Sequence, residues 1–421
     1  MSVYYVSSSG NDANDGLTPK TAWKTIGKIN KSIFGGDEVR LCCGDIFYGR
    51  IVPPEGSDPN HPTTFTSYGE GEKPVVSQYI LPKIGAWENH EKNIYKLDVR
   101  DTEKFDGNHL SANSNAGFFK VDGEFKYKKR FLAEELSENW DFYCDKRYIY
   151  VYLDKSPDAL STDIKIAPDV RSMEFATNLK VTNIIFQGTG GHGISGVSQN
   201  AYISDCEFRE IGGSRLGGIE RKGAFNRIRY GNGIEAWANS RNVTVENCMF
   251  SDIYDAAITM QGSHVQTSWE NCFFRHNVIQ NCTQAFEIWS NGDIPNTGFI
   301  NCRFEDNICI NCGYGWGYDA RTNKGVAAPL LIYGLGCPMT DITVRRNIIS
   351  KVRESLIFKA GGYSEIPESY KIYDNIILYD KNRPLVARDA SVNISFEEKA
   401  YDNKLRRDNR VYDVKEYTPE I

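Results

Sequence analysis

The chain has 421 residues, of which 25% are charged, and its formal net charge is -6. This mildly acidic balance gives no sign of a nucleic-acid-binding protein, and the absence of a run of about 18 apolar residues argues against a membrane span. The 37 glycines indicate frequent turns rather than long helices. The first residues lack a basic segment followed by an apolar run, so we expect no signal peptide and either a cytoplasmic protein or a processed form of a secreted one.

The N-terminal region, residues 1–35, is expected to hold a strand and one amphipathic helix. The stretch KTAWKTIGKINKSI at residues 20–33 has the apolar spacing of a helix. We expect it to cover the N-terminal end of a repeat structure, because the open ends of such structures need caps. The preceding stretch GNDANDG, residues 10–16, predicts a turn in which Asp and Asn side chains bond the backbone. A calcium site is the alternative there, and we expect no other cofactor.

The rest of the chain divides into three parts. Residues 80–170 lack a regular rhythm and are expected to form a small insertion of hairpins with a short helix. Residues 172–385 consist of short runs rich in Val, Ile and Phe, separated by Gly, Asn and Asp, which is typical of successive strands. Residues 386–421 are polar and irregular, and we expect a C-terminal cap or tail.

The regular part contains a short repeat, Asp/Asn-Cys-x-Phe, whose cysteines are Cys206, Cys248, Cys272 and Cys302. A period near 24 residues with irregular insertions fits one coil of a parallel β-helix, in which equivalent side chains of neighbouring coils stack about 4.8 Å apart. We therefore expect like residues to stack on each other, with the Asn turned inward to bond the backbone. Because the cysteines recur at coil spacing rather than in close pairs, the pattern favours small buried residues over disulfides or a metal site.

Three further stretches resemble a known superfamily. They are YYVSSSGNDANDGLTPKTAWKTI, GDEVRLCCGDIFYGRI and NWDFYCDKRYIYVYLD. They resemble right-handed parallel β-helix proteins of the pectate-lyase-like superfamily, including carbohydrate-active members. The resemblance implies an all-β fold, a right-handed parallel β-helix that runs through residues 1–421 as a single domain. That superfamily includes polysaccharide lyases, glycoside hydrolases, epimerases, esterases and phage depolymerases, so the resemblance does not select a reaction, and no catalytic residue is carried over from it.

One face of the predicted coils displays polar and aromatic side chains. Four-residue alternating stretches begin at Ile194, Ile234, Ile258, Phe286, Leu330 and Leu356. Successive side chains of a strand point to opposite faces, so the second and fourth residues face outward if the first and third face the core. The predicted outward residues include Glu235, Trp237, Thr259, Gln261, Glu287, Trp289, Tyr333 and Lys359.

Carboxyl groups on this face suggest glycoside hydrolysis. Each coil adds one strand, or rung, to this face, about 4.8 Å from the next. Glu235 and Glu287 lie two rungs apart, which separates their backbones by about 9.6 Å. Inverting glycosidases hold their two carboxyls about 6.5–9.5 Å apart and retaining ones about 5–5.5 Å. Asp255 comes between the two glutamates in coil order and could pair with either at the shorter distance. The alternative is that these carboxylates bind substrate hydroxyls or form salt bridges with arginines.

The other candidate residues would bind a sugar. Aromatic rings match the apolar faces of sugar rings, which suggests Trp237, Trp289 and Trp316 as platforms, unless loops bury the tryptophans in a second small core. A basic loop carrying Arg227 and Arg229 is either solvated or grips the carboxylate of an acidic sugar. The remaining residues assigned to substrate binding are Gln261, Asn232, Tyr333, Lys359 and His192.

These observations predict a carbohydrate-active enzyme, with hydrolysis of a polysaccharide or oligosaccharide as the first hypothesis. The second is a lyase or epimerase that acts on a uronic-acid-containing glycan, with Lys359, Tyr333, His192 or an arginine as the base. The third is a non-catalytic glycan-binding or virion-type structural protein. For the oligomeric state, a monomer and a side-by-side homotrimer are both open.

Overall fold

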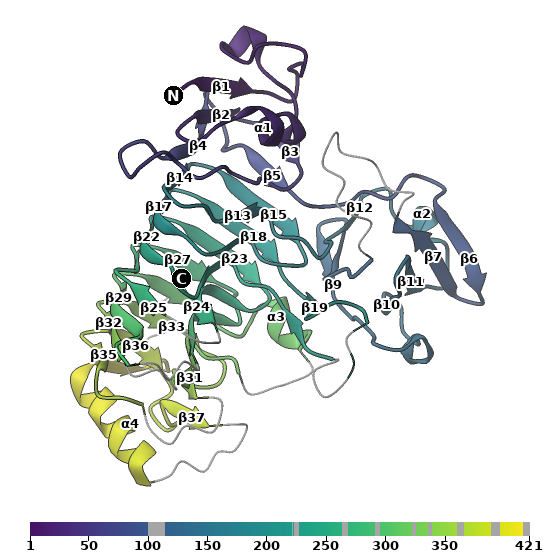
Figure 1. The fold of residues 1–421 in the computed structure, drawn as a ribbon. Coiled ribbons are helices and arrows are strands. Elements are labelled where there is room, and N and C mark those ends of the chain that lie inside the picture. Colours follow the sequence, from purple (N-terminus) through teal and green to yellow (C-terminus); the bar gives the residue numbers. More distant parts are fainter. Residues whose placement is uncertain are drawn as a thin grey trace.

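The computed structural model describes residues 1–99, 114–220, 222, 227–262, 268–290, 295–321, 326–335, 339–359, 366–388 and 396–415, without the side chains of residues 333–335, 388 and 396–398. Within these ranges no helix is long and apolar enough to cross a membrane. Most elements are short strands that form coils stacked from the N-terminal to the C-terminal end, with a separate lobe at one side (Figure 1). The predicted all-β fold, a parallel β-helix, is confirmed.

Three parallel sheets form the walls of the coils. Sheet A contains β1 (Val3–Val6), β2 (Glu38–Cys42), β4 (Thr63–Tyr68), β14 (Leu179–Thr182), β17 (Gln199–Ser204), β22 (Arg241–Glu246), β25 (Ser268–Glu270), β26 (Phe273–Arg275), β29 (Gly298–Glu305), β32 (Met339–Arg345) and β35 (Tyr370–Tyr373). Sheet B contains β3 (Ile46–Tyr48), β5 (Val75–Ser77), β15 (Ile185–Thr189), β18 (Glu207–Ile211), β23 (Met249–Ile253), β27 (Val278–Gln280), β30 (Ile308–Ile310), β33 (Ile348–Ser350), β36 (Ile376–Tyr379) and β38 (Arg410–Asp413). Sheet C contains β13 (Met173–Glu174), β16 (Ile194–Gly196), β21 (Ile234–Trp237), β24 (Ala256–Gly262), β28 (Gln284–Ser290), β31 (Leu330–Leu335), β34 (Ile357–Lys359) and β37 (Val386–Arg388).

The interior of the coils is a stack of like side chains. Phe186, Phe208 and Phe250 lie one above another, with ring centroids 5.3 and 4.9 Å apart and nearly parallel planes. The repeat cysteines are buried free thiols, which confirms that they act as small core residues rather than disulfides. Because the strands of each sheet lie about 4.8 Å apart, a side chain that fits one coil fits the same place in the next.

The four copies of Asp/Asn-Cys-x-Phe do not form one column, so that part of the predicted register is wrong. Asp205 and Asn247 stand in the turn before a strand of sheet B, whereas Asn271 stands between β25 and β26 and Asn301 lies within β29, all in sheet A. All four residues have φ between 51 and 54°, the left-handed region that Asn and Asp tolerate best. At both places in the coil a residue with positive φ is followed by a small buried cysteine, so the same motif occurs in two columns.

The inward-facing asparagines belong to a different column. Asn277, Asn307, Asn347, Asn375 and Asn409 are all at least 93% buried, and each of the first four side chains donates from Nδ2 to Oδ1 of the next asparagine over 2.8–3.0 Å. The backbone N–H of each earlier residue also donates to that oxygen. This buried column supplies partners for turn backbone groups that would otherwise be unsatisfied inside the protein.

The N-terminal end is closed by α1 (Ile26–Ser32), which is shorter than the predicted helix 20–33. A separate 3₁₀ turn, η1, occupies Pro19–Thr21, and the Thr25 side chain accepts a hydrogen bond from the Lys28 N–H and thereby fixes the start of α1. In the stretch 10–16, Asn11 Oδ1 accepts the N–H of Ala13 at 2.9 Å and Asp15 Oδ1 accepts the N–H of Leu17 at 3.0 Å, which are contacts of the predicted turn. Asp12 also accepts hydrogen bonds from the backbone of Lys24 and Thr25 at 2.7 and 3.0 Å, which tie the turn to the start of α1.

The lobe beside the coils is an insertion of antiparallel strands with a core of its own (Figure 1). One small sheet pairs β6 (Trp87–Glu91), β7 (Ile94–Asp98), β10 (Phe142–Cys144) and β11 (Tyr148–Tyr152), and another pairs β8 (Phe119–Val121), β9 (Glu124–Lys126) and β12 (Ile164–Ile166). The insertion also contains the 3₁₀ turn η3 (Ala133–Glu135) and the short helix α2 (Pro157–Leu160). A second segment that leaves the coils, here called an excursion, forms the hairpin of β19 (Ser214–Arg215) and β20 (Arg229–Tyr230).

The C-terminal region is more regular than the sequence suggested. Residues 386–421 were predicted to form a cap or tail, and in their described part α4 (Phe396–Asp408) lies at the end of the stack, followed by β38, which pairs with β36 (Figure 1). Leu405 of α4 is 2% exposed and belongs to the main core. The sparse apolar residues of this helix hid it, because only one face of it has to meet the coils.

Candidate active site

The outward side chains of sheet C form a line in which carboxyl and hydroxyl groups alternate. Strand pairing places these residues in consecutive rungs: Ser195, Glu235, Thr259, Glu287, Leu331 and Phe358. The alternate positions Ile234, Ala236, Ile258 and Met260 are fully buried in the main core, which shows that this line faces away from it. The predicted register of Glu235, Thr259 and Glu287 is therefore confirmed.

A second outward line runs parallel to the first. Trp237, Gln261 and Trp289 are paired in consecutive rungs, and both tryptophans are half-buried. A register shift after Ile288 then pairs Trp289 with Gly334, so Tyr333 does not continue the line as predicted. The Tyr333 side chain lies outside the described part of the structure.

Lys359 does not face the outward side of the sheet, so its prediction as a substrate-binding residue is wrong. Strand pairing sets Phe358 opposite Leu331 and Lys359 opposite Ile332, which belongs to the main core. The predicted alignment was one residue out of register. Leu331 and Phe358 instead pack with Val326 and Ala328 in a small apolar cluster, which ends the polar part of the outward line.

Glu235 is held by two neighbouring side chains, those of His192 and Gln261. His192 Nε2 lies 3.3 Å from Glu235 Oε1, and the Gln261 side chain donates a hydrogen bond to the same oxygen. His192 Nδ1 accepts the Asn232 N–H at 3.0 Å, which leaves Nε2 as the nitrogen that carries the proton toward Glu235. Glu235 is only 7% exposed, so its carboxylate is presented by fixed partners rather than by a mobile side chain.

Asn232 supports this arrangement and does not bind substrate as predicted. It is 2% exposed, and its side-chain oxygen accepts the N–H of Ala256 at 3.0 Å. The residue therefore fixes His192 with its backbone and the start of β24 with its side chain. His192 also contacts the ring of Tyr230 edge-on, with ring centroids 5.0 Å apart.

Glu287 stands beside a buried ion pair. Arg321 Nη1 bonds Asp255 Oδ1 at 2.9 Å, and the side chains of both residues are largely buried. Burial raises the pKa of Glu287 to about 8, the negative charge of Asp255 adds to this, and Arg321 and the Thr259 hydroxyl oppose it. The Glu287 carboxyl is therefore mostly protonated at pH 7. Glu235, the other carboxyl in this outward line, instead has His192 and Gln261 beside its oxygen.

Replacing Asp255 with asparagine is expected to lower the pKa of Glu287 by about 1 pH unit, because a neighbouring negative charge disappears while the positive Arg321 stays. The measurement is a carbon NMR titration of protein labelled at the glutamate side-chain carboxyl. The matched control is Asp319→Asn, which removes a more exposed carboxylate that pairs with Arg353 on the same excursion as Arg321. An unchanged or raised pKa of Glu287 in the Asp255 variant would contradict this electrostatic account.

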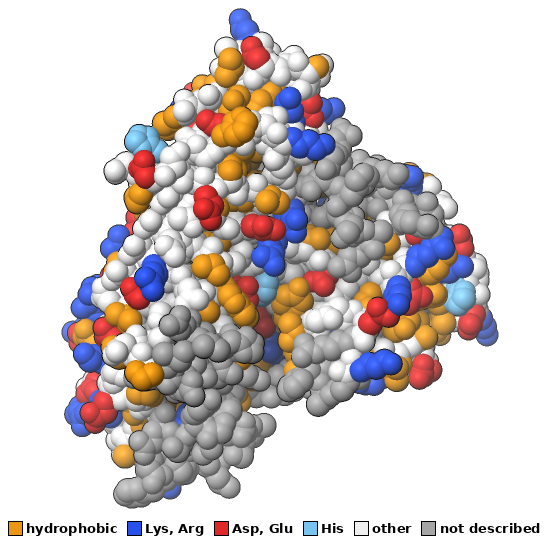
Figure 2. Space-filling view, in the orientation of Figure 1, with side chains coloured by type: hydrophobic (Ala, Val, Ile, Leu, Met, Phe, Trp, Pro, Cys, Tyr) orange, Lys and Arg blue, Asp and Glu red, His pale blue; other side chains and the backbone are white. Residues whose placement is uncertain are grey.

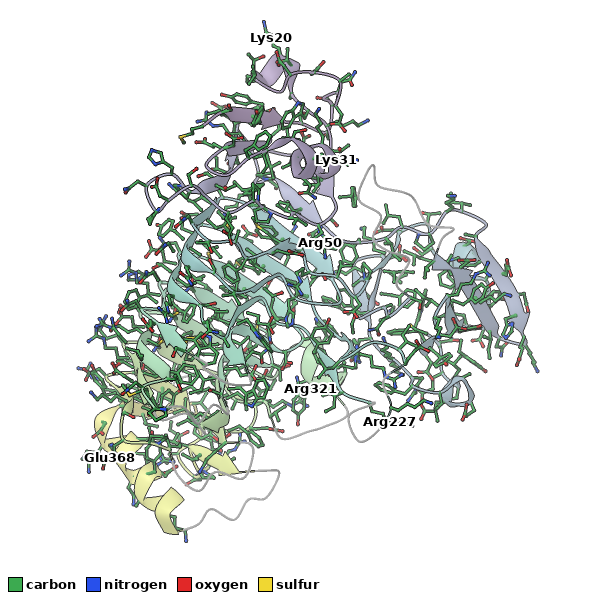
Figure 3. All side chains as sticks on the ribbon, viewed as in Figure 1. Lys20, Lys31, Arg50, Arg227, Arg321 and Glu368 are labelled. Atoms are coloured by element: carbon green, nitrogen blue, oxygen red, sulfur yellow. The ribbon has the colours of Figure 1, made fainter. Side chains whose placement is uncertain are left out.

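Sequence reasoning missed Arg321 altogether. It follows α3 (Trp316–Asp319), a short helix on an excursion from the coils, where no repeat indicates which side chains turn inward. The available signal was a charged residue within five positions of two aromatic ones, Trp316 and Tyr318, and this pattern is too common to indicate a site. Figure 3 shows Arg321 below α3 against the coils, and Arg227 farther out at the base of the insertion.

The two arginines predicted to grip an acidic sugar are engaged elsewhere, and that prediction is corrected. Arg227 pairs with Glu135 of the insertion at 2.6 Å. Arg229 is 3% exposed and donates to four backbone carbonyls, those of Gly117, Tyr127, Gly213 and Ala320, over 2.6–3.1 Å. It therefore fastens the insertion, the β19–β20 hairpin and the excursion that carries Arg321 to one another.

Trp316 is a packing residue rather than the predicted sugar platform. It is 6% exposed, its ring stacks on Phe125 with centroids 5.3 Å apart, and its Nε1 donates to the Asp252 carbonyl at 2.9 Å. Tyr254 in the same cluster contacts two guanidinium groups, those of Arg229 and Arg321, at 5.0 and 5.1 Å from its ring centre. The alternative to sugar platforms was that loops bury the tryptophans in a second small core. Such a core is present, and it buries Trp316 but not Trp237 or Trp289.

Five predicted residues therefore lie together in the candidate site: Glu235, His192, Gln261, Glu287 and Asp255. Five others predicted to bind substrate have structural roles instead: Asn232, Trp316, Arg227, Arg229 and Lys359. Figure 2 shows a hollow between the coils and the insertion where acidic, basic and histidine side chains meet. The described residues include no group of three or more His, Cys, Asp or Glu side chains that could hold a metal ion.

Known proteins resemble this chain in fold rather than in sequence. A search of curated proteins found no match to the chain. A solved structure of XylC with xylose is 11% identical, with 97% of this chain and 82% of that one covered and a TM-score of 0.49. A GH136 lacto-N-biosidase from Eubacterium ramulus is 12% identical, with 98% of this chain and 68% of that one covered and a TM-score of 0.45. An alginate lyase from Paenibacillus sp. str. FPU-7 is also 12% identical, with 86% of this chain and 87% of that one covered and a TM-score of 0.45. Residues 172–328 match the family model described as a right handed beta helix region, which agrees with the right-handed parallel β-helix predicted for these coils.

Proposed function

We propose that the protein is a carbohydrate-active enzyme that hydrolyses glycosidic bonds in a polysaccharide or oligosaccharide, with Glu287 as general acid and Glu235 as general base. The observation that carries the proposal is that these two buried carboxyls stand in one outward line, two rungs apart, in different electrostatic environments. Burial and Asp255 keep Glu287 protonated near neutral pH, which a general acid requires.

The proposed step is an inverting displacement. Glu287 donates its proton to the glycosidic oxygen while that oxygen leaves the anomeric carbon. Glu235 takes a proton from a water whose oxygen forms the new bond at the opposite face of that carbon. Backbones two rungs apart are separated by about 9.6 Å, which suits the wider carboxyl spacing of inverting enzymes. His192 and Gln261 hold Glu235 in place for this step.

The second outward line supplies the surface on which a sugar would rest. Trp237 and Trp289 are two rungs apart on either side of Gln261, and all three are partly exposed. Flat indole rings contact the apolar faces of sugar rings, and an amide can bond their hydroxyls. In this proposal the tryptophans hold sugar rings beside the two carboxyls.

The charges at the site favour a neutral sugar over a uronic acid. Arg321 is paired with Asp255, Arg227 with Glu135, and Arg229 with backbone carbonyls. A lyase needs a group that neutralises the substrate carboxylate, and each of these arginines is already occupied. We therefore rank polysaccharide lysis or epimerisation second, and glycan binding without turnover third.

The test is product analysis on a panel of neutral and uronic-acid-containing glycans. The hydrolase proposal predicts new reducing ends without ultraviolet absorption, and loss of turnover in Glu235→Gln by at least about 100-fold. The matched control is Glu174→Gln, since Glu174 is two rungs from Glu235 on the same face but pairs with Arg50. An unsaturated, absorbing product would identify a lyase instead. Binding without turnover on every glycan, or full activity of Glu235→Gln, would overturn the proposal.

A further inference from the structure

An open cavity of about 600 Å³ lies where strands of sheet B end and the chain turns toward sheet C. The residues that follow four successive strands of sheet B line it: Asn281 after β27, Asn311 after β30, Lys351 after β33 and Asp380 after β36. None of the described residues that line it belongs to the outward lines of sheet C, so this cavity is separate from the candidate active site. Sites for small ligands commonly measure about 300–1,000 Å³, so this cavity is large enough for one.

Tyr314 places an aromatic ring in the lining of this cavity. The ring is 54% exposed, and the Arg353 guanidinium lies 5.8 Å from its centre. The Tyr314 N–H donates to the Asn311 carbonyl at 3.0 Å. At the next residue, Gly315, a Cβ would lie only 1.9 Å from the Asn281 carbonyl oxygen, so glycine is what lets the chain pass this close to the coils. The coils therefore hold the backbone of an exposed aromatic residue in a fixed place.

The charged groups of the cavity differ in how far they are already engaged. Asp380 pairs with Lys415 at 3.4 Å, and Arg383 donates to backbone carbonyls. Lys351 is exposed, and among the described residues no hydrogen bond or ion pair engages its ammonium group. A ligand in the cavity would therefore meet Lys351 as an available hydrogen-bond donor.

The lining combines apolar and polar parts. Its apolar walls come from Val352, Leu378 and Val414. The Asn311 side chain donates to Asn281 Oδ1 at 3.2 Å, and Asn281 also bonds Asp252, so these amides are fixed relative to one another. A sugar ring has apolar C–H faces and hydroxyl groups at its edges. An exposed aromatic ring beside fixed amides and an ammonium group suits both parts of such a ligand.

We propose that this cavity is a second carbohydrate-binding site, in which a sugar unit rests against the Tyr314 ring while its hydroxyls bond Lys351 and Asn311. A polysaccharide held there and at the candidate active site gains affinity, because the first contact raises the effective concentration of the chain at the second. Only this joint occupancy rests on the proposed function. The binding of a sugar beside Tyr314 does not depend on whether the protein cleaves it.

The first test is fluorine NMR of protein labelled with fluorotyrosine and titrated with neutral and uronic-acid-containing hexasaccharides. The Tyr314 resonance, identified by its absence in Tyr314→Phe, is expected to shift with at least one of them. The resonance of Tyr202, an exposed tyrosine of sheet A, should stay in place. Lys351→Met is expected to raise the Kd that the Tyr314 shift reports by about 10-fold. A Tyr314 resonance that no hexasaccharide moves would overturn the second site, including the case in which saccharides bind only at the candidate active site.

The second test is kinetic, on a glycan that the protein cleaves. Tyr314→Ala is expected to raise KM for the polysaccharide about 10-fold with kcat unchanged, and to leave both constants unchanged for an oligosaccharide too short to reach both sites. Tyr202→Ala is the matched control and should behave as the unmodified protein on both substrates. An unchanged KM for the polysaccharide in Tyr314→Ala would refute joint occupancy, and a lower kcat on the short substrate would refute the separation of the two sites. Full rates in Glu235→Gln and Glu287→Gln would instead refute the hydrolase proposal and leave the NMR result standing.

Discussion

Replacing Glu287 with glutamine is expected to reduce turnover by about 1,000-fold and to make the protein more stable at alkaline pH. Glutamine has the shape of the protonated glutamic acid but cannot donate its proton to a leaving group, and general acid catalysis contributes about 100- to 10,000-fold. The stability gain follows from the raised pKa of Glu287, because the folded protein must either keep this carboxyl neutral or bury its charge.

The sign and the pH range of this gain follow from the pKa of Glu287 in the two states. The unfolded chain ionises this carboxyl near pH 4.5 and the folded protein near pH 8. The contribution to stability is therefore complete below pH 4.5, and it is lost as the pH rises toward 8. The difference between the two pKa values corresponds to an upper bound of about 5 kcal/mol.

The measurement is the free energy of unfolding of both proteins by denaturant at pH 4 and pH 9. The stability of Glu287→Gln relative to the unmodified protein should increase between the two pH values. Glu174→Gln, whose carboxylate is partly exposed, should show no comparable increase. A constant difference between pH 4 and pH 9 would show that Glu287 is ionised in the folded protein, and the general-acid assignment would fall with it.

Replacing Asn347 with leucine is expected to destabilise the protein by about 4 kcal/mol. Asn347 is fully buried in the asparagine column, where its side chain donates to the Phe304 carbonyl and to Asn375 and accepts from the side chain and backbone of Asn307. Leucine is similar in size but leaves these groups without partners inside the coil. Each buried unsatisfied group costs about 1–3 kcal/mol.

The control for Asn347→Leu is Asn382→Leu, which makes the same chemical change at an exposed turn position. This control should alter the free energy of unfolding by less than about 0.5 kcal/mol. Urea denaturation followed by circular dichroism measures both variants. A loss in Asn347→Leu no greater than in the control would mean that the column is not a source of stability.

The register of sheet C near the site could be predicted from the sequence. Glu235, Thr259 and Glu287 each lie between two apolar residues, and a strict alternation fixes which side chains share a face. The same reasoning failed at Leu356-Ile357-Phe358, where three consecutive apolar residues allow two alignments, and the wrong one was chosen. A one-residue slip exchanges the two faces of a strand, and it moved Lys359 from the interior to the outward line.

The surroundings of the carboxyls could not be predicted from the repeat. Arg321, Arg229 and Trp316 lie on excursions from the coils, and their partners come from segments that are distant in the sequence. Arg229 illustrates the difficulty, since a basic residue in a glycine-rich stretch suggests a solvated loop. Its four carbonyl partners from three parts of the chain become apparent only when the insertion is packed against the coils.

The buried asparagine column has an electrical direction. Each Nδ2 before Asn409 donates one hydrogen to the next asparagine toward the C-terminal end and the other to a carbonyl of the preceding coil. Each Oδ1 accepts from the preceding asparagine, so the side-chain amides share one direction along the axis, with their N–H groups toward Asn409. Asn409 Nδ2 meets the Leu405 carbonyl in the last turn of α4 at 2.8 Å, where the unpaired carbonyls of a helix carry partial negative charge. A helix docked in the reverse sense would bring N–H groups against N–H groups. The closing helix is therefore matched to the stack by polarity as well as by shape.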